Sequence, residues 1–423
     1  MNRRPELHPH IAIIGGGITG VIAALFLARI FKSGNRPISL TLYERRNDIL
    51  QGASLELARL HMGGEYPLDR QTADDCVTGA FLFAQIFPKQ VFSEIQGIDY
   101  LVHADSVTAG KLTVQQLLES YEGSRSLYSD YYRSAAANDY YSPLGDPAKL
   151  YRVLAETELK PGIAGGISTN ELGFNSTSLN QFLNELIKNE SDIQIDSNCH
   201  IVEAKPEGEG YRLFDNDSKS SFADIVINSS WESASFLNRK IAPDAEIPAA
   251  YLRALGIADI SACGPVSRPT FILLDEYGGM FSPVDESKAL LYAPLDELSH
   301  IRRLMPEDLQ PDMLATLTVT SKKQDELKTK LYDHIVKLYP HLKRMQIEKL
   351  HISPTFSFDQ DISKRRHLAA AMIAPNWYSL ICTKATYSVW AALQIVSLIA
   401  PESLTGFDLE DCPVVPQLFH LGS

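Results

Sequence analysis

A glycine-rich turn between two apolar segments constrains this chain more than any other feature. Residues 11–14 form a short apolar run of the kind found in buried parallel strands, and they lead into Gly-Gly-Gly-Ile-Thr-Gly at residues 15–20. Residues 21–31 follow with helical spacing of apolar side chains, and residues 38–43 form a second strand that ends on Glu44. This order of strand, G-x-G-x-x-G, helix, strand and acidic residue predicts a dinucleotide-binding βαβ unit.

Each part of this unit has a physical role in binding a dinucleotide. Gly15 permits the tight turn, Gly17 lets the backbone approach a pyrophosphate, and Gly20 lets the helix pack close to the strand. The helix N-terminus offers amide groups to the phosphates, and Glu44 can accept hydrogen bonds from both ribose hydroxyls of an adenosine. The predicted cofactor-binding residues of this unit are Gly15, Gly17, Ile18, Thr19, Gly20 and Glu44.

Residues 11–31 have about the length of a transmembrane helix, so a membrane span is the first alternative. The three consecutive glycines near its start, Arg29 near its end and the strand that follows argue against a span. Arg3 and Arg4 precede the run, but no small-residue cleavage site follows it, which argues against a secretory signal. We therefore expect no transmembrane segment.

Length, charge and cysteine content narrow the class of protein. A chain of 423 residues exceeds the usual limit for one hydrophobic core, so we expect two domains. The net charge of −13 argues against nucleic acid or an anionic membrane as a partner. The five cysteines are widely spaced without a zinc pattern, so we expect reduced thiols, a cytoplasmic protein and no metal.

The segment after Glu44 carries a family resemblance. Arg45 follows the acid directly, residues 52–54 read Gly-Ala-Ser, and residues 61–66 read His-Met-Gly-Gly-Glu-Tyr. These motifs resemble those of the FAD-dependent oxidoreductases of the D-amino-acid oxidase (DAO) superfamily, in which a His-x-Gly-x-x-Tyr segment runs along the flavin. Within that superfamily, the N-terminal motifs are most similar to those of the L-2-hydroxyglutarate dehydrogenase branch.

The resemblance implies FAD as the cofactor. The Ser54 hydroxyl is expected to bond the pyrophosphate or the ribityl chain. His61 either bonds covalently to the flavin methyl group or packs beside the flavin without a bond, and we favour the second arrangement. Arg59 and Glu65 either form an ion pair that lines the site or lie on a solvated loop. The cofactor contacts expected in this segment are Arg45, Ala53, Ser54, Arg59, His61 and Met62.

Two later segments depart from the family pattern. Relatives usually have Ala-Gly after an asparagine at the end of a returning strand, whereas this chain has Ser-Ser-Trp at residues 229–231, and Trp231 is expected to close over FAD or pack against it. The turn before the last helix is usually glycine-rich, whereas here it is residues 383–386. In the family this helix points at the flavin N1–C2=O, where Lys384 would add a positive charge. The contacts expected there are Lys384, Ala385 and Thr386.

The sequence does not identify a general base. Arg365 or Arg366 can bind an anionic substrate at the flavin face, although tandem arginines more often lie on the surface. The tyrosines between residues 128 and 141 can bind a substrate carboxylate, but such clusters are more often packing residues. The catalytic candidates are His61, Arg366 and Lys384.

We therefore predict an α/β fold with a Rossmann-like FAD-binding domain of the glutathione-reductase type and a second α+β substrate domain built on an antiparallel sheet. Locally, residues 112–118 and 383–399 predict helices, and residues 193–201 and 314–319 predict strands. The predicted FAD-binding domain comprises residues 8–90, 165–238 and 360–400, the substrate domain residues 91–164 and 239–359, and the C-terminal tail residues 401–423.

The reaction that the resemblance implies is removal of a hydride from a C–H next to nitrogen or oxygen, in an amine, amino acid or 2-hydroxy acid, onto flavin N5. One alternative is an NAD(P)-dependent enzyme, because Arg45 and Arg46 can bind a 2′-phosphate, but that reading leaves residues 52–54 and 61–66 without a role. Another is an FAD-binding protein without net redox turnover, either mutase-like or accessory. The sequence does not indicate the substrate, or whether oxygen or a quinone reoxidises the flavin.

Overall fold

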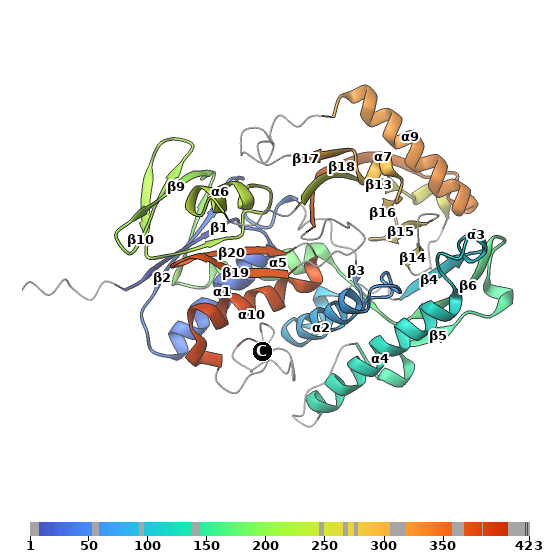
Figure 1. The fold of residues 1–423 in the computed structure, drawn as a ribbon, viewed down its shortest axis with the longest axis horizontal. Helices are drawn as coiled ribbons and strands as arrows, with labels where there is room; N and C mark the ends of the chain where they lie inside the picture. Colours follow the sequence, from blue (N-terminus) through green and yellow to red (C-terminus); the bar gives the residue numbers. More distant parts are fainter. Residues whose placement is uncertain are drawn as a thin grey trace, which may run out of the picture.

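The fold is built around two large β-sheets that lie side by side, with several helices beneath them in the view of Figure 1. It is known from a computed structural model. The residues that the structure describes are 8–52, 59–92, 97–136, 144–244, 249–264, 270–274, 278–304, 319–357, 368–382, 384–404, 419 and 421.

The first sheet has six strands in the order β19-β20-β12-β1-β2-β8, and every neighbouring pair is parallel except β19 and β20. The strand β1, which precedes the glycine turn, lies between β12 and β2. This is the parallel sheet that the βαβ unit predicts, and the predicted fold class is confirmed. The strands are β1 (His10–Ile14), β2 (Ser39–Glu44), β8 (Ile193–Ser197), β12 (Ile225–Asn228), β19 (Leu368–Ala374) and β20 (Trp377–Cys382).

Both faces of this sheet are covered, which explains why β1 is apolar throughout. Ile11 and Ile13 pack in the core that includes α1 and α10, whereas Ala12 and Ile14 pack against a three-stranded antiparallel sheet, β9-β10-β11. Figure 1 shows β9 and β10 on the opposite side of the sheet from α1 and α10. These elements are α1 (Ile18–Ser33), α10 (Ser388–Ile399), β9 (Ile201–Glu207), β10 (Gly210–Asp215) and β11 (Ser220–Ala223).

The second sheet has nine strands and is antiparallel except for the parallel pair β4 and β14. Its neighbours run in the order β17-β13-β16-β15-β14-β4-β6-β5, with β18 also paired to β13. The strands are β4 (Ile98–His103), β5 (Tyr151–Val153), β6 (Ile163–Thr169), β13 (Ala249–Asp259), β14 (Thr270–Leu273), β15 (Gly279–Pro283), β16 (Lys288–Tyr292), β17 (Arg302–Leu304) and β18 (Gln346–Ser357).

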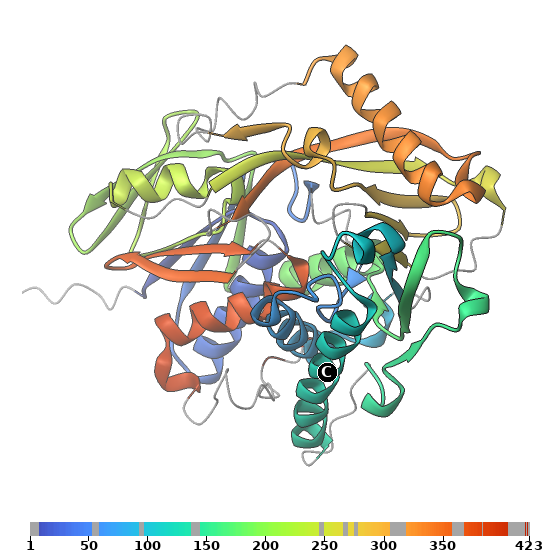
Figure 2. The ribbon, with the colours of Figure 1, turned by 45° about the vertical axis from the view of Figure 1, so that its right-hand side comes forward.

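Helix α9 (Ser321–Leu338) covers the outer face of the nine-stranded sheet, as Figure 2 shows. Its buried residues Leu327, Leu331 and Ile335 recur every four positions, which places them on one side of the helix against the sheet. The remaining helices and short strands are α2 (Arg70–Ile86), α3 (Ala104–Thr108), α4 (Val114–Ala136), α5 (Ser176–Lys188), α6 (Ala234–Ile241), α7 (Asp296–Ser299), β3 (Arg59–Leu60) and β7 (Leu172–Gly173).

Several local predictions differ from the structure. The helix predicted at residues 112–118 is the much longer α4, which carries the buried Tyr128 and Tyr131 outside both cavities described below. The single strand predicted at residues 193–201 is two strands, because Asn198 adopts a left-handed conformation with φ of 59° between β8 and β9. The strand predicted at residues 314–319 lies almost wholly outside the described residues.

Two boundaries also differ. The last α-helix begins at Ser388 rather than at residue 383, because a 3₁₀ turn, Ala385–Tyr387, precedes it. Strand β6 pairs with β4 and β5 in the nine-stranded sheet, although residues 165–169 were assigned to the FAD-binding domain. The division of the chain into two domains otherwise stays a prediction.

Some features of the described residues bear on the class of protein. No helix in this part of the chain is both long enough and apolar enough to cross a bilayer. No group of three or more His, Cys, Asp or Glu side chains within the described ranges is arranged to hold a metal ion. The described cysteines, Cys76, Cys199, Cys263 and Cys382, carry free thiols.

We predict that Gly20→Ala destabilises the protein by roughly 3 kcal/mol, because overpacking against rigid backbone has that order of cost. A Cβ at Gly20 would lie 2.1 Å from the carbonyl oxygen of Gly15, which cannot move without opening the turn. Gly34→Ala at the other end of α1 is the control, since the nearest atom to its Cβ would be in the flexible Arg36 side chain, at 3.2 Å, and the nearest backbone atom at 3.4 Å. Urea unfolding of both variants checks this, and equal midpoints would contradict it.

Candidate functional site

Two connected cavities lie where the two large sheets meet. The larger, of about 430 Å³, runs from the end of β2 across the glycine turn to the residues before α10, and we call it the groove. The smaller, of about 300 Å³, lies between residues 59–66 and the nine-stranded sheet, and we call it the chamber. The groove and the chamber share four lining residues, Trp231, Arg253, Thr355 and Lys384. A ligand in the groove therefore reaches the chamber directly.

The glycine turn forms the tightest contact of the groove. Gly15 has a φ of 110°, a conformation that favours glycine, and its amide donates to the carbonyl of Tyr43 over 2.8 Å. A Cβ at Gly15 would lie 2.4 Å from the carbonyl oxygen of Ser229, whose amide in turn donates to Ile14 over 2.8 Å. The ends of β1, β2 and β12 therefore converge on this glycine, which leaves backbone rather than side chains at the groove floor.

The polar groups along the groove suit an anionic ligand with a ribose. No side chain caps α1 at Gly17, and its first turn has no acidic residue, so the positive end of the helix dipole is not neutralised there. The Glu44 carboxylate is buried and held by two amides: Oε2 accepts from Gly16 over 2.8 Å and Oε1 from Arg46 over 2.9 Å. Arg45 forms an ion pair with Glu232.

The structure brings together most of the predicted cofactor contacts but not all. Gly15, Gly17, Ile18, Thr19, Glu44, Arg45, Trp231, Lys384 and Ala385 line the groove. Arg59 and His61 line the chamber, as do Trp231 and Lys384. Gly20, Met62 and Thr386 are buried and line neither cavity. The predicted residues Ala53, Ser54, Arg365 and Arg366 lie outside the described residues.

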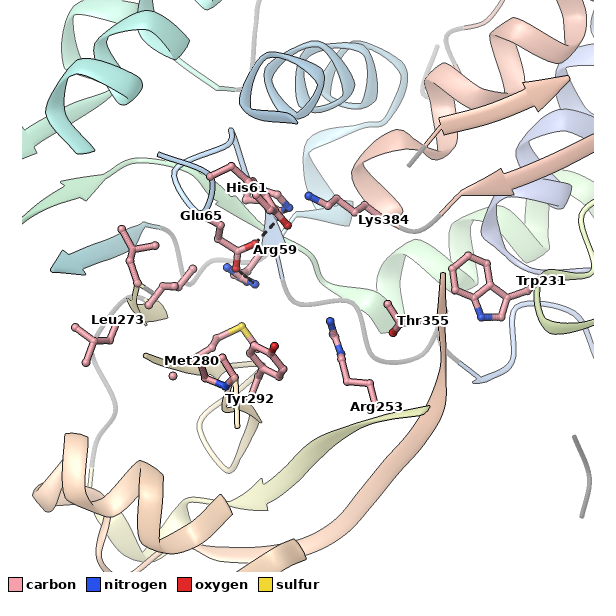
Figure 3. Close-up of a pocket in the computed structure, with 15 residues that line it drawn as sticks. Arg59, His61, Glu65, Trp231, Arg253, Leu273, Met280, Tyr292, Thr355 and Lys384 are labelled. Atoms are coloured by element: carbon pink, nitrogen blue, oxygen red, sulfur yellow. Dashed lines mark ion pairs between the residues drawn. The ribbon is translucent and has the colours of Figure 1, made fainter. Parts of the chain in front are cut away.

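One wall of the chamber is a cluster of charged side chains from residues 59–66 and Lys384 (Figure 3). Arg59 Nη2 and Glu65 Oε1 form an ion pair of 2.7 Å, and His61 Nε2 lies 3.9 Å from the other oxygen of Glu65. Lys384 Nζ lies 3.8 Å from the centre of the Tyr66 ring, which is a close cation–π contact. Of the two predicted arrangements of Arg59 and Glu65, the structure has the ion pair, and both residues line the chamber.

Burial and charge set the protonation states of this cluster. Burial and the positive charges of Lys384 and Arg59 lower the pKa of His61 to about 3, although Glu65 opposes them. Burial would raise the pKa of Glu65, but Arg59 and the other nearby cationic groups hold it well below its usual range. At neutral pH, Glu65 is therefore charged and the His61 imidazole is neutral.

Two buried polar atoms of the cluster have no hydrogen-bond partner among the described residues: Nδ1 of His61 and Nη1 of Arg59. A buried polar group without a partner costs on the order of 1–3 kcal/mol, and such groups occur where a ligand or water completes them. Both residues line the chamber. The chamber therefore has hydrogen-bonding capacity that the protein itself does not use.

The opposite wall comes from the predicted antiparallel sheet, but none of the residues that line it was predicted from the sequence as a site residue. Arg253 of β13 extends toward the charged cluster, with its guanidinium carbon 4.8 Å from the centre of the Tyr292 ring (Figure 3). The local sequence signal is limited to alternation, because Arg253 stands between Leu252 and Ala254, which are both buried. Apolar residues complete this wall, namely Ile272, Leu273, Leu274, Met280 and Pro294.

The chamber carries a net positive charge. Arg59, Lys384 and Arg253 contribute three positive charges, Glu65 contributes one negative charge, and His61 is neutral, so the net charge of the lining is +2. A partly enclosed cavity with this charge attracts anions more strongly than an exposed surface would, because water screens the field less. Charge therefore selects for an anionic ligand.

Comparisons with known proteins agree with this geometry. The model of the FAD dependent oxidoreductase family, DAO, matches residues 10–368 of the chain. Among characterised relatives, the FAD-dependent monooxygenase kojA of Aspergillus flavus is 37% identical over 82 residues, which are 19% of this chain and only 18% of that protein.

Solved structures with a similar fold cover nearly the whole chain. The L-proline dehydrogenase of P. horikoshii has a TM-score of 0.64 at 15% identity, over 96% of both chains. The glycine oxidase of Geobacillus kaustophilus has a TM-score of 0.62 at 13% identity, over 96% of this chain and 99% of that one. The FAD-bound L-alpha-glycerophosphate oxidase of Mycoplasma pneumoniae has a TM-score of 0.61 at 15% identity, over 92% and 94%. At these identities the likeness concerns the fold.

We predict that His61 makes the protein less stable in mild acid. The unfolded chain binds a proton on this imidazole near pH 6.5 and the folded one only near pH 3, so stability is lost as the pH falls below 6.5. Between pH 6.5 and pH 5 the loss is about 2 kcal/mol. His61→Gln should remove this part of the pH dependence, whereas His8→Gln, at an exposed position, should keep it. Urea unfolding at pH 7 and pH 5 measures the difference, and an unchanged His61→Gln profile would refute it.

Proposed function

The chain belongs to the DAO family of FAD-dependent oxidoreductases, and from this membership we propose that it oxidises a small anionic substrate by removing a hydride from a C–H bond next to nitrogen or oxygen. The observation that carries the proposal is the positively charged chamber, which opens into a groove suited to a dinucleotide. An amino acid or other carboxylate-bearing amine is the substrate class that we favour.

In this proposal, FAD lies along the groove in one direction. Glu44 would bind the adenosine ribose, and the amides at Gly17 and the start of α1 would bind the pyrophosphate. The flavin ring would then lie where the groove meets the chamber, between Trp231 and Lys384. The unpartnered Nδ1 of His61 and Nη1 of Arg59 support this direction, because they supply unused hydrogen-bonding capacity at that end.

Bound FAD would supply the redox chemistry by accepting the hydride at its N5 atom. The protein's own contribution is position and charge. Lys384 keeps a positive charge beside the flavin site, where it favours negative charge that develops during the reaction. The ion pair of Arg59 and Glu65 holds that side of the chamber rigid, and the apolar wall that includes Leu273 and Met280 keeps water out.

Arg253 is the residue that we propose binds the substrate carboxylate. Arg253 extends from the facing sheet toward the charged cluster, with its guanidinium beside the Tyr292 ring. A guanidinium can bind a carboxylate with two parallel hydrogen bonds, which fixes the orientation of the substrate. The reacting carbon would then lie between Arg253 and the flavin site.

The protonation states favour an amine over a hydroxy acid. Oxidation of a hydroxy acid requires a group that removes the hydroxyl proton, and such a base works best with a pKa near the working pH. Among the described residues that line the chamber, His61 and Glu65 both have a pKa far below that. An amine that binds neutral needs no such base. The resemblance of the N-terminal motifs to the L-2-hydroxyglutarate dehydrogenase branch supports 2-hydroxy acids as the second class to test.

Anaerobic bleaching of the flavin tests the proposal. The FAD-loaded protein is mixed without oxygen with a panel of amino acids, secondary amines and 2-hydroxy acids, and the flavin absorbance is followed. We expect bleaching by at least one carboxylate-bearing amine and none by the same amine without its carboxylate. Bleaching only by hydroxy acids would overturn the amine assignment, and no bleaching by any donor would favour an FAD protein without redox turnover.

We predict that Arg253→Gln raises KM for the substrate roughly 30- to 150-fold while kcat changes only a few-fold, because the charged hydrogen bonds it removes are worth about 2–3 kcal/mol. Arg303→Gln is the matched control, since Arg303 is exposed on β17 and lines neither cavity. Steady-state kinetics of both variants check this. An unchanged KM in Arg253→Gln would mean that another group binds the carboxylate.

A further inference from the structure

Glu171 is a fully buried carboxylate just behind the chamber, and the proposed reaction does not use it. It lies between β6 and β7, and its exposed fraction is 0%. Its main-chain carbonyl accepts a hydrogen bond of 2.8 Å from the amide of Gly97, which ties it to the start of β4. Its side chain points into the protein, where three different segments meet.

The two carboxylate oxygens of Glu171 together accept three hydrogen bonds, one from each of the three segments. Oε1 accepts from the hydroxyl of Tyr121 on α4 over 2.5 Å. Oε2 accepts from the hydroxyl of Tyr100 on β4 over 2.9 Å and from the amide of Met62 over 2.9 Å. All three partners are donors, which matches an ionised carboxylate because that group can only accept.

The buried charge of Glu171 lowers the stability of the folded protein, so we expect it to serve a function. No Lys, Arg or His of the described residues forms an ion pair with Glu171 within 4 Å. Burying a carboxylate without a paired cation is unfavourable, and a neutral glutamine would avoid most of that cost. Buried charges kept in this way are found mostly near functional sites.

The hydrogen bonds of Glu171 reach the wall of the chamber through the backbone. Met62 lies between the chamber residues His61 and Glu65, so its amide anchors the segment that carries both. The Tyr100 ring also packs directly against this segment at Gly64, where an added Cβ would lie only 2.4 Å from the ring. The residue after Glu171 begins β7, which pairs with β3 and so with Arg59.

We propose that Glu171 is a positioning residue: its buried carboxylate, held by Tyr100 and Tyr121, fixes the segment from Arg59 to Tyr66 against the flavin and the substrate. This inference deepens the proposed function and rests on it. Glu171 does not touch the reacting atoms, and it acts through the amide of Met62 and the ring of Tyr100.

The titration of Glu171 gives the proposal a pH signature. Burial raises the pKa of Glu171 to about 7, although Tyr121, Tyr100, the Met62 amide and the Arg59 charge oppose the rise. Both tyrosines stay protonated because burial and Glu171 raise their pKa well above 10. A protonated carboxyl group is itself a donor on one oxygen, so one of the three hydrogen bonds must break or reorganise as the pH falls below about 7.

Visible circular dichroism of the bound flavin tests this without any substrate, because the signal reports the surroundings of the ring. In the FAD-loaded protein we expect a transition with a midpoint near pH 7. Glu171→Gln should retain FAD but lack the transition. Tyr121→Phe should move the midpoint to higher pH, since it removes the hydrogen bond that lowers the pKa of Glu171 most. Glu185→Gln, on the exposed face of α5, should behave as the wild type.

Kinetics provide a second readout once a substrate is known. The limiting rate of flavin reduction should fall about tenfold from pH 8 to pH 6 in the wild type, as expected for a loosened positioning contact. In Glu171→Gln it should be low and independent of pH. If Glu171→Gln shows the same dichroism transition as the wild type, the proposal is overturned. If Glu171→Gln does not fold, an unchanged midpoint in Tyr121→Phe overturns it instead. Absence of bleaching by any donor would instead count against the proposed function and leave the dichroism result intact.

Discussion

The structure depends on one contact, the approach of the Ser229 carbonyl to Gly15, where no Cβ can fit. That contact brings the ends of β1, β2 and β12 together, so the glycine turn, Glu44 and Trp231 all lie along one groove. Because α1 starts at the same turn, its dipole points into the groove as well. The six-stranded sheet thus forms one half of the site, and strands β13 to β16 and β18 of the nine-stranded sheet supply residues to the other.

The charged groups of the groove and those of the chamber suit different ligands. The groove combines a buried carboxylate with an uncapped helix N-terminus, the pair of features that a nucleotide needs. The chamber combines paired charges from residues 59–66 with Arg253 from the facing sheet, and its net charge favours an anion. Arg253 of β13 and Lys384 both line the groove and the chamber.

The elements of the fold that local sequence patterns determine could be predicted from the sequence. The βαβ unit and its glycines follow from short-range periodicity, and the structure has them at those positions. The proposed roles of Arg253 and Glu171 could not be predicted, because they depend on residues more than 100 positions away in the sequence. Lys384 lies across the chamber from Arg253, and the amide of Met62 binds Glu171. The start of α10 was misplaced because a 3₁₀ turn and an α-helix share the same apolar pattern.

The central claim is that the groove from Glu44 to Lys384 holds FAD without a covalent bond. The most direct measurement is an absorption spectrum of the purified protein before and after acid precipitation. We predict that the native protein shows flavin bands, and that acid precipitation releases all of this flavin, as FAD, into the supernatant. Flavin retained in the precipitate would contradict the non-covalent packing of His61. A colourless protein that FAD cannot reconstitute would contradict the assignment of the groove itself.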